Sequence, residues 1–194
     1  MKYNFFAFIS RMRYINRWGL MRNSILENIE GHSFQTSVLA HALGVINNTY
    51  LGGNVDANRL AVIALYHDAP EIITGDLPTP VKYFSAGIVD AYDEVEKTAK
   101  NKLISKLPQP MSDIYKEIFD YGKTKDDIQY KLVKAADTLS ALIKCIEEQK
   151  AGNTEFDSAK KAIYEKLISY ELEEVRLFME LFIDGYYLPL DDQE

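Results

Sequence analysis

Apolar residues recur at steps of three and four along most of the chain, which is the spacing of one face of an α-helix. Two such stretches contain Val38, Leu39, Ala42, Leu43, Val45 and Ile46, and then Leu60, Ile63, Ala64 and Tyr66. Further helices are predicted at about 86–107, 112–119, 126–150 and 156–182. Alternation of apolar and polar positions, which would indicate strands, is scarce. The pattern therefore predicts an all-α protein.

Glycine and proline separate the predicted helices. They occur at Gly52 and Gly53, Pro78 and Pro80, Pro108 and Pro110, Gly122, and Gly152. None of these breaks is long enough for an interdomain linker, and no internal repeat or low-complexity tract is visible. We therefore expect residues 1–194 to form a single-domain helical bundle of about six or seven helices.

Composition predicts an ordered protein and narrows its partners. The 194 residues are 47% hydrophobic and 12% aromatic, which is enough for a sizeable core. A formal net charge of -7 and a pI near 5.1 argue against broad adhesion to a nucleic-acid polymer or to an anionic membrane. A small anionic ligand is still compatible with this charge, because a local positive site or a metal overrides the global sign.

The sequence also favours a cytoplasmic location. Cys145 is the only cysteine, so no intrachain disulfide forms and a reducing compartment is expected. The apolar patch near the N-terminus is followed by Arg11, Arg13 and Arg17 and not by a small-residue cleavage site, which is the wrong order for a secretory signal. No run approaches the ~18 apolar residues that a transmembrane helix requires.

Two predicted helices carry charged residues within apolar surroundings. His67 and Asp68 lie near the end of the segment AVIALYHDAPEI, and Asp137 lies on the apolar face of KLVKAADTLSALIKCIEE. Burial of an unpaired carboxylate is costly, so each aspartate needs a partner. A divalent metal is one compact partner. A His–Asp hydrogen bond, a helix N-terminus or an arginine elsewhere in the chain is the alternative.

The chain has two further histidines. His32 follows a glycine and precedes a helical run, where the glycine lets the backbone turn and aim the imidazole inward. His41 lies among apolar residues and is interpreted as a buried or partly buried packing residue outside the site. Two imidazoles and two carboxylates, from His32, His67, Asp68 and Asp137, would suit Mn, Co, Fe, Zn or Mg, with positions left for water and a substrate oxygen.

The order His32, His67-Asp68, Asp137 resembles the metal motif of the HD-domain phosphohydrolase superfamily, whose members are helical and metal-dependent. Longer strings carry a more specific resemblance. HDAPEIITGDLPTPVKYF, NRWGLMRNSILENIEGHS and KAADTLSALIKCIEE followed by AGNTEF resemble the bacterial 5'-deoxynucleotidases of that superfamily. The likeness covers nearly the whole chain and fades after about Tyr164.

The resemblance implies roles for individual residues. His32, His67, Asp68 and Asp137 match the four metal ligands, and Asp68 and Asp137 also border the substrate. Glu71 matches the catalytic glutamate, and its carboxylate would share the helical face of His67 and Asp68 if the helix continued. Pro70 departs from the family pattern, in which a small residue is expected at this position. Proline removes one helical hydrogen bond and would kink the turn, which affects the direction of the Glu71 side chain.

Substrate residues are implied in the same way. Arg17 matches a residue that binds the phosphate and assists catalysis, and Trp18 matches one beside the sugar. Asp76, Leu77, Pro78 and Thr79 match the substrate-binding loop, in which Asp76 is expected at the sugar hydroxyl. A surface cation, a core aromatic ring and a rigid proline turn are the plain structural alternatives for these residues.

The resemblance thus implies a metal-dependent phosphomonoesterase that converts deoxyribonucleoside 5'-monophosphates to deoxyribonucleosides and phosphate, and that discriminates against ribonucleotides. It also implies one divalent ion, Co, Mn or similar, and a homodimer. The C-terminal stretch VRLFMELFIDGYYLPL would either form an apolar dimer surface or pack on its own bundle. Hydrolysis of a cyclic nucleotide, a triphosphate or an alarmone is an alternative, as is a non-catalytic nucleotide-binding module.

Overall fold

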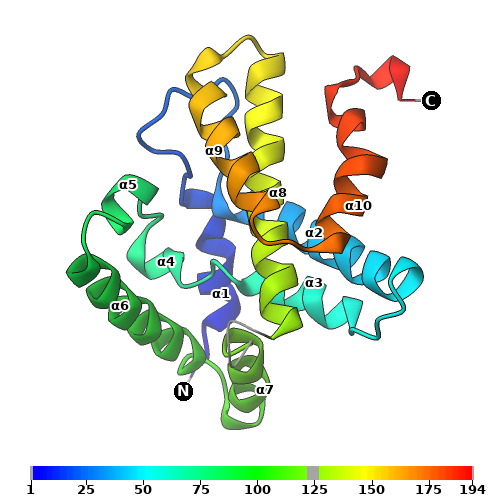
Figure 1. Ribbon diagram of the computed structural model, residues 1–194. Coiled ribbons are helices and arrows are strands. Elements are labelled where there is room, and N and C mark those ends of the chain that lie inside the picture. The colour runs from blue at the N-terminus through cyan, green and yellow to red at the C-terminus, as the bar shows by residue number, and fades with distance from the viewer. Residues whose placement is uncertain (1, 122–126, 194) are drawn as a thin grey trace.

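The computed structural model describes residues 2–121 and 127–193, whose regular structure is helical (Figure 1). The α-helices are α1 (Phe5–Ile9), α2 (Ile29–Tyr50), α3 (Ala57–Tyr66), α4 (Glu71–Thr74), α5 (Thr79–Lys82), α6 (Ala86–Ile104), α7 (Gln109–Phe119), α8 (Ile128–Lys150), α9 (Asp157–Ile168) and α10 (Glu173–Phe182). Short 3-10 helices are η1 (Ser10–Tyr14), η2 (Thr154–Phe156), η3 (Ile183–Tyr187) and η4 (Leu190–Asp192). None of the described helices combines the length and the apolar character needed to cross a bilayer.

The all-α prediction is confirmed, although the number of helices is higher than predicted. The surplus consists of α1, α4 and α5, which have only four or five residues each. The predicted helix at 156–182 is also two helices, because the chain turns between α9 and α10, where Glu171 has a φ of 52°. The predicted break at Gly122 and the predicted helix start at 126 lie outside the described residues.

Helices α2, α3 and α8 pack together at the centre of the molecule (Figure 1). Each begins at a side-chain cap: Asn28, Asp56 and Asp127 accept hydrogen bonds from backbone amides of the first turn. The largest side chains that they bury are Ile29, Leu43, Leu60, Ile63, Leu132, Leu139, Leu142, Ile143 and Ile146. This packing fixes the first turn of α2, the end of α3 and the middle of α8 relative to one another.

Glycine at position 44 lets α2 and α3 approach closely. A Cβ atom at Gly44 would lie 2.9 Å from the side chains of Ala57 and Leu60, closer than real Cβ contacts. Two residues of α2 that were predicted on its apolar face, Val38 and Val45, are instead 53% and 41% exposed. The buried face of α2 is therefore narrower than the sequence pattern indicates.

A second buried cluster lies beside the end of α3. It consists of Phe5, Met12, Ile29, Ala69, Leu103, Leu107 and Phe119. Tyr66 completes it with edge-to-face contacts to Tyr115 and Phe119. Because Ala69 belongs to the turn between α3 and α4, this cluster holds in place the turn that carries His67 and Asp68.

The C-terminal stretch packs only in part. Val175 and Phe178 of α10 are buried in the main core, whereas Leu181 and Phe182 are half exposed. The first part of α10 thus packs on its own bundle, as one prediction stated, and the dimer surface stays a prediction for the exposed part. The segment after α10 returns to the pair formed by α8 and α9: Lys150 of α8 donates to the backbone oxygens of Tyr186 and Leu188, and Lys160 of α9 lies over the Tyr187 ring.

Candidate metal centre and substrate site

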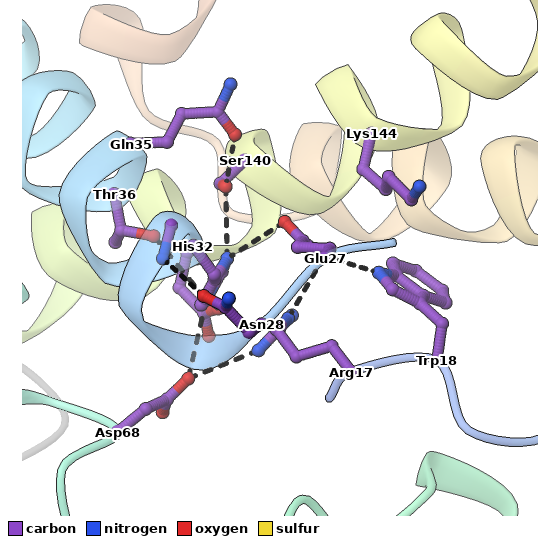
Figure 2. A network of polar contacts seen from close by, with 12 residues as sticks. Arg17, Trp18, Glu27, Asn28, His32, Gln35, Thr36, Asp68, Ser140 and Lys144 are labelled. Carbon is purple, nitrogen blue, oxygen red and sulfur yellow. Dashed lines mark hydrogen bonds and ion pairs between the residues drawn. The ribbon is translucent and has the colours of Figure 1, made fainter. Parts of the chain in front are cut away.

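His32 is fully buried in the first turn of α2. Its Nδ1 lies 3.1 Å from Ser140 Oγ of α8, and the Ser140 hydroxyl donates to Gln35 Oε1 at 2.6 Å (Figure 2). Because Ser140 uses its own proton for Gln35, it accepts from His32, which places the imidazole proton on Nδ1. The lone pair on His32 Nε2 therefore faces Asp68 and Asp137, whose nearest oxygens lie 3.4 and 3.1 Å away.

His67 follows α3 directly and presents its Nε2 to the same place. Its Nδ1 donates to the backbone oxygen of Ala64 at 2.6 Å, so Nε2 carries the second lone pair. Carboxylate oxygens of Asp68 and Asp137 lie 3.2 and 3.8 Å from this Nε2. The atom is buried without a hydrogen bond, as expected of a nitrogen that faces a cation.

These four residues form one cluster, although His32 and Asp137 are 105 positions apart in the sequence. Ligand atoms of His32, His67 and Asp68 all lie within 4.8 Å of one another. Asp137 Oδ1 adds a fourth donor beside both imidazoles. Two imidazole nitrogens and two carboxylates form a donor set that first-row divalent ions accept. The residues present therefore fit a divalent metal.

The charges of the cluster favour a cation. Burial disfavours protonation of His67, but with no cation bound Asp68 and Asp137 outweigh it and raise the pKa of His67 to about 10, so a metal at Nε2 would take the place of a proton there. Burial also acts to raise the pKa of the two aspartates, but nearby positive groups outweigh it. Lys134 and the two histidines hold the pKa of Asp137 well below its usual range. The two histidines have the same effect on the pKa of Asp68. The carboxylates are thus ionised and attract positive charge.

Glu71 lies at the edge of this cluster in a different environment. It is the first residue of α4, and its Oε2 is buried without a hydrogen-bond partner. Burial, reinforced by the charges of Asp68 and Asp76, raises the pKa of Glu71 to about 9. A carboxyl group with such a pKa holds a proton at neutral pH and can exchange it with a bound ligand.

Arg17 and Trp18 reach the site from the loop between η1 and α2. Arg17 Nη1 lies 3.2 Å from Asp68 Oδ2, and Arg17 Nε donates to Glu27 Oε2 at 3.3 Å (Figure 2). Trp18 Nε1 donates to the same Glu27 oxygen at 2.7 Å. The arginine that the sequence left as an alternative partner of Asp68 is therefore present, but it contacts Oδ2, while Oδ1 faces His67.

Asp76 is the first residue of the predicted substrate-binding segment 76–79, and it lies beside the loop that carries Arg17 and Trp18. It lies close enough to the Arg17 guanidinium and the Trp18 backbone amide for both to lower its pKa, but burial outweighs them and raises it. Of the following predicted residues, Leu77 and Pro78 are half-buried and Thr79 is exposed at the start of α5. The proximity of Asp76 to Arg17 and Trp18 places this segment beside the cluster.

A family profile described as "5'-deoxynucleotidase YfbR-like" matches residues 4–186 of the chain. The chain belongs to this family. It is 46% identical over 189 residues to the 5'-deoxynucleotidase YfbR of Escherichia coli K12, covering 97% of this chain and 94% of that protein. The Shigella flexneri 5'-deoxynucleotidase YfbR is 47% identical over the same length.

Solved structures share the fold of this YfbR-like chain. An HD-domain phosphohydrolase from Listeria innocua matches with a TM-score of 0.82 and 24% identity, covering 94% of this chain and 88% of the other. The HD phosphohydrolase DatZ of cyanophage S-2L, bound to dA and one catalytic Zn²⁺ ion, matches with a TM-score of 0.65 and 20% identity, covering 92% and 95% of the two chains.

Three residues of the site in this YfbR-like protein were not predicted. Ser140 accepts the hydrogen bond from His32 Nδ1 and is itself oriented by Gln35. Glu27 accepts hydrogen bonds from the side chains of Arg17 and Trp18. Ser140 follows Asp137 by three positions and so shares its helical face, which is a signal that the sequence did contain. Glu27 lies in a loop, where no periodicity indicates the direction of a side chain.

Two sequence interpretations need correction. His41 lies outside the cluster as predicted, but it is exposed on α2 and not a packing residue. Helix α3 also ends at Tyr66, so Glu71 does not continue its face but begins α4 after a turn. Pro70 is the N-cap of α4, where a missing amide proton costs no helical hydrogen bond, and it does not kink a helix.

Proposed function

We propose that this protein hydrolyses deoxyribonucleoside 5'-monophosphates to deoxyribonucleosides and inorganic phosphate, at the centre formed by His32, His67, Asp68 and Asp137. The observation that carries the proposal is the convergence of four donor groups from distant parts of the chain on one buried place. Membership of the 5'-deoxynucleotidase YfbR-like family supports the reaction class.

One divalent ion, cobalt, manganese or a similar metal, is proposed as the cofactor. When bound, such an ion lowers the pKa of a water ligand toward neutrality and polarises a phosphoryl oxygen. The hydrogen bonds of both imidazole Nδ1 atoms support this role, because they leave each Nε2 free to bind.

Arg17 is proposed to bind the substrate phosphate. Its guanidinium is mostly buried, and Asp68 and Glu27 raise its pKa although burial opposes the charge. A buried, permanently charged fork neutralises phosphate oxygens and the additional charge of the transition state. Asp68 is therefore placed to contact both the metal and the arginine, and Asp137 borders the same space from α8.

Glu71 is proposed to move the proton during hydrolysis. Its buried carboxyl group, with a pKa near 9, is protonated at neutral pH, so it gives its proton to the departing 5' oxygen and takes up the proton that the attacking water loses. A purely structural metal site would need neither this group nor Arg17. The pair favours an enzyme over a non-catalytic binding module.

Trp18 and the Asp76 segment are proposed to select the sugar. An indole packed against C2' leaves an added ribose hydroxyl desolvated without a partner, which costs about 1–3 kcal/mol, or roughly ten- to a hundredfold in selectivity. Asp76, near Arg17 and Trp18, is the proposed acceptor for the remaining sugar hydroxyl. Leu77, Pro78 and Thr79 complete the proposed binding loop.

Phosphate release from dAMP and AMP, measured with the metal content of the same preparation, tests this function. We expect metal-dependent release from dAMP and at least tenfold lower kcat/KM for AMP, as the hydroxyl penalty implies. Cyclic nucleotides, nucleoside triphosphates and an alarmone serve as comparison substrates. Faster turnover of any of these, or equal turnover of dAMP and AMP, contradicts the proposal.

The whole chain is proposed to act as a single-domain cytoplasmic homodimer. One main buried cluster spans α2, α3, α8, α9 and α10, which supports a single domain. The lone, buried Cys145 suits a reducing compartment. Leu181 and Phe182 offer exposed apolar surface to a second copy, so Leu181→Lys with Phe182→Lys should halve the mass found by light scattering. An unchanged mass places the dimer contact elsewhere.

A further inference from the structure

Glu27 lies at the centre of the contacts that hold the proposed substrate residues. Only 14% of its side chain is exposed, and its Oε2 accepts from both Arg17 Nε and Trp18 Nε1 (Figure 2). Its other oxygen, Oε1, lies 3.9 Å from His32 Nδ1, on the side of the ring away from the cluster. Glu27 is therefore a partner of substrate residues and not a fifth metal ligand.

The backbone brings both side chains to this single carboxylate. Neighbouring side chains in extended backbone point to opposite sides, so Arg17 and Trp18 would ordinarily diverge. Trp18 instead has a φ of 59°, in the left-handed region that large residues rarely adopt. Across the loop, the Arg17 amide donates to the Glu27 backbone oxygen at 2.9 Å, which sets the two segments side by side. Backbone strain at a ligand-binding residue is typical of functional sites.

Each of the two side chains also has a close contact other than Glu27 among the described residues. The Trp18 ring packs edge-on against the fully buried Phe156, with centroids 5.3 Å apart. The second arm of Arg17 lies on Asp68. Without Glu27, the indole would keep a ring contact that allows rotation, and Arg17 would keep its ion pair with the proposed metal ligand Asp68 and the charge of Asp76 nearby. Among the described residues, Glu27 alone accepts side-chain hydrogen bonds from both the guanidinium and the indole.

We infer that Glu27 is a positioning residue that fixes Arg17 and Trp18 together, and thereby links phosphate binding to selection of the deoxyribose. This inference rests on the proposed function and deepens it. The charge of Glu27 orients the guanidinium, while the same oxygen sets the angle of the indole beside the sugar. Removal of the carboxylate should therefore affect both phosphate affinity and sugar discrimination, although Glu27 touches neither group.

Trp18 is the only tryptophan of the chain, which provides a readout independent of catalysis. Glu27→Ala should raise acrylamide quenching of its fluorescence and lower its anisotropy, because the indole gains rotational freedom. Glu30→Ala is the matched control: Glu30 lies three positions on, about half exposed, in a surface ion pair with Arg13. Unchanged quenching in Glu27→Ala, or an equal change in Glu30→Ala, overturns the inference.

The link to selectivity is tested with a double-mutant cycle of Glu27→Ala and Trp18→Ala. The ratio of kcat/KM for dAMP to that for AMP should fall about tenfold in Glu27→Ala, which is the loss of one hydroxyl penalty. It should fall no further when Glu27→Ala is added to Trp18→Ala. The KM for dAMP should still rise in the double variant, since Arg17 also loses its partner.

The outcomes separate this inference from the proposed function. If the unchanged protein does not prefer dAMP, the proposed selectivity fails and the inference with it. If it prefers dAMP and Trp18→Ala lowers the preference, but Glu27→Ala does not, the inference alone fails. Independent, additive effects in the cycle also overturn it. Should Glu27→Ala not fold, the near-isosteric Glu27→Gln replaces it, with a smaller loss expected in the same direction and again none in the Trp18→Ala background.

Discussion

At the residue scale, two carboxylates three positions apart have opposite protonation behaviour. Burial raises the pKa of both Asp68 and Glu71. At Asp68, His67 and His32 outweigh burial and lower the pKa well below its usual range. At Glu71, the charges of Asp68 and Asp76 add to burial instead, and the pKa is about 9. Asp68 is thus suited to bind a cation and Glu71 to carry a proton.

Glu71→Gln tests this division of roles. The amide keeps the size of the side chain but cannot exchange the proton, so kcat for dAMP should fall about 10²- to 10⁴-fold. Metal content and the KM for dAMP should stay close to those of the unchanged protein. Glu94→Gln, at an exposed position of α6, is the control and should leave kcat unchanged. Loss of metal from Glu71→Gln would show that Glu71 is a ligand.

Apart from the family resemblance, which implied Arg17, Trp18 and Glu71 among others, the sequence pattern revealed only residues whose charge conflicts with apolar surroundings. Asp68 and Asp137 are charged residues in apolar segments, so their need for a partner can be read directly. Glu27 is one of many acidic residues, and only the folded loop brings it to Arg17 and Trp18. The left-handed backbone of Trp18 is likewise invisible in the sequence, because such a conformation is usually indicated by glycine.

At the scale of elements, the loop that carries Arg17 and Trp18 is fastened to α8 by a buried ion pair. Glu148 is fully buried and accepts from the backbone amides of Ser24 and Ile25. Lys144, one turn earlier, donates to Glu148 and to the Ile25 backbone oxygen. The loop is thereby held by its backbone, which leaves its side chains free for the site.

This attachment should depend on pH. Burial raises the pKa of Glu148, but hydrogen bonds from Lys144, Asn153 and the loop amides outweigh it and lower the pKa from 4.5 to about 2. A lowered pKa stabilises the fold above pH 4.5, and the stabilisation is lost as pH falls toward 2. The free energy of unfolding, measured by urea titration, should therefore fall over this interval less steeply in Glu148→Gln than in the unchanged protein.

Glu147→Gln is the matched control for that measurement. Glu147 is the preceding residue. Its side chain is exposed overall, but partial desolvation of its carboxyl group raises its pKa, which is the opposite direction to Glu148. Replacement of Glu147 should not make the free energy of unfolding fall less steeply between pH 4.5 and 2. If Glu148→Gln and Glu147→Gln give the same slope, the buried pair does not contribute to acid sensitivity. Glu148→Gln should also be less stable at neutral pH, because Lys144 is left buried without its partner.

The contact between α2 and α3 allows a test of packing. In Gly44→Ala the added Cβ would lie 2.9 Å from Ala57 and Leu60, so the helices must separate. We expect a loss of about 1–3 kcal/mol in unfolding free energy, measured by chemical denaturation. Gly87→Ala, in α6 with no atom within 4 Å of the added Cβ, should instead be neutral or stabilising. Equal effects at both positions would contradict this account.

At the scale of the whole molecule, the proposed metal centre joins three separate helical units. His32 comes from the start of α2, His67 and Asp68 from the turn after α3, and Asp137 from the middle of α8. A cation at this place would cross-link the elements that form the main core. Binding to the folded chain alone then adds to its stability in proportion to the logarithm of metal concentration.

Removal of metal should accordingly lower the melting temperature. Dialysis against a chelator should reduce Tm, and added Mn²⁺, Co²⁺ or Zn²⁺ should restore it in a concentration-dependent way, followed by calorimetry. In His67→Ala the same treatment should have a much smaller effect, because one donor is missing. His41→Ala, at the exposed histidine of α2, is the control and should respond as the unchanged protein does. An identical response of His67→Ala would remove this residue from the centre.

The helices that could be predicted from the sequence are those long enough to show one continuous apolar face. The central helices α2, α3 and α8 have such faces, and their existence was predicted from spacing alone. The turn at Glu171 was missed because apolar residues continue through it from α9 into α10, without a glycine or proline. Short α4 and α5 were missed because four residues are too few for any periodicity.

The left-handed backbone at Trp18 also affects which substitutions this position tolerates during evolution, and therefore how the proposed sugar selectivity could change. Glycine adopts this conformation freely, so exchange of the tryptophan for glycine would relieve strain of about 1 kcal/mol or more while it discarded the indole. Isoleucine or valine would face the full steric penalty and offer no ring. Random substitution at this codon thus meets less resistance in the direction that would abolish the proposed discrimination, and a lasting preference for deoxyribose of the kind proposed here would require purifying selection on Trp18.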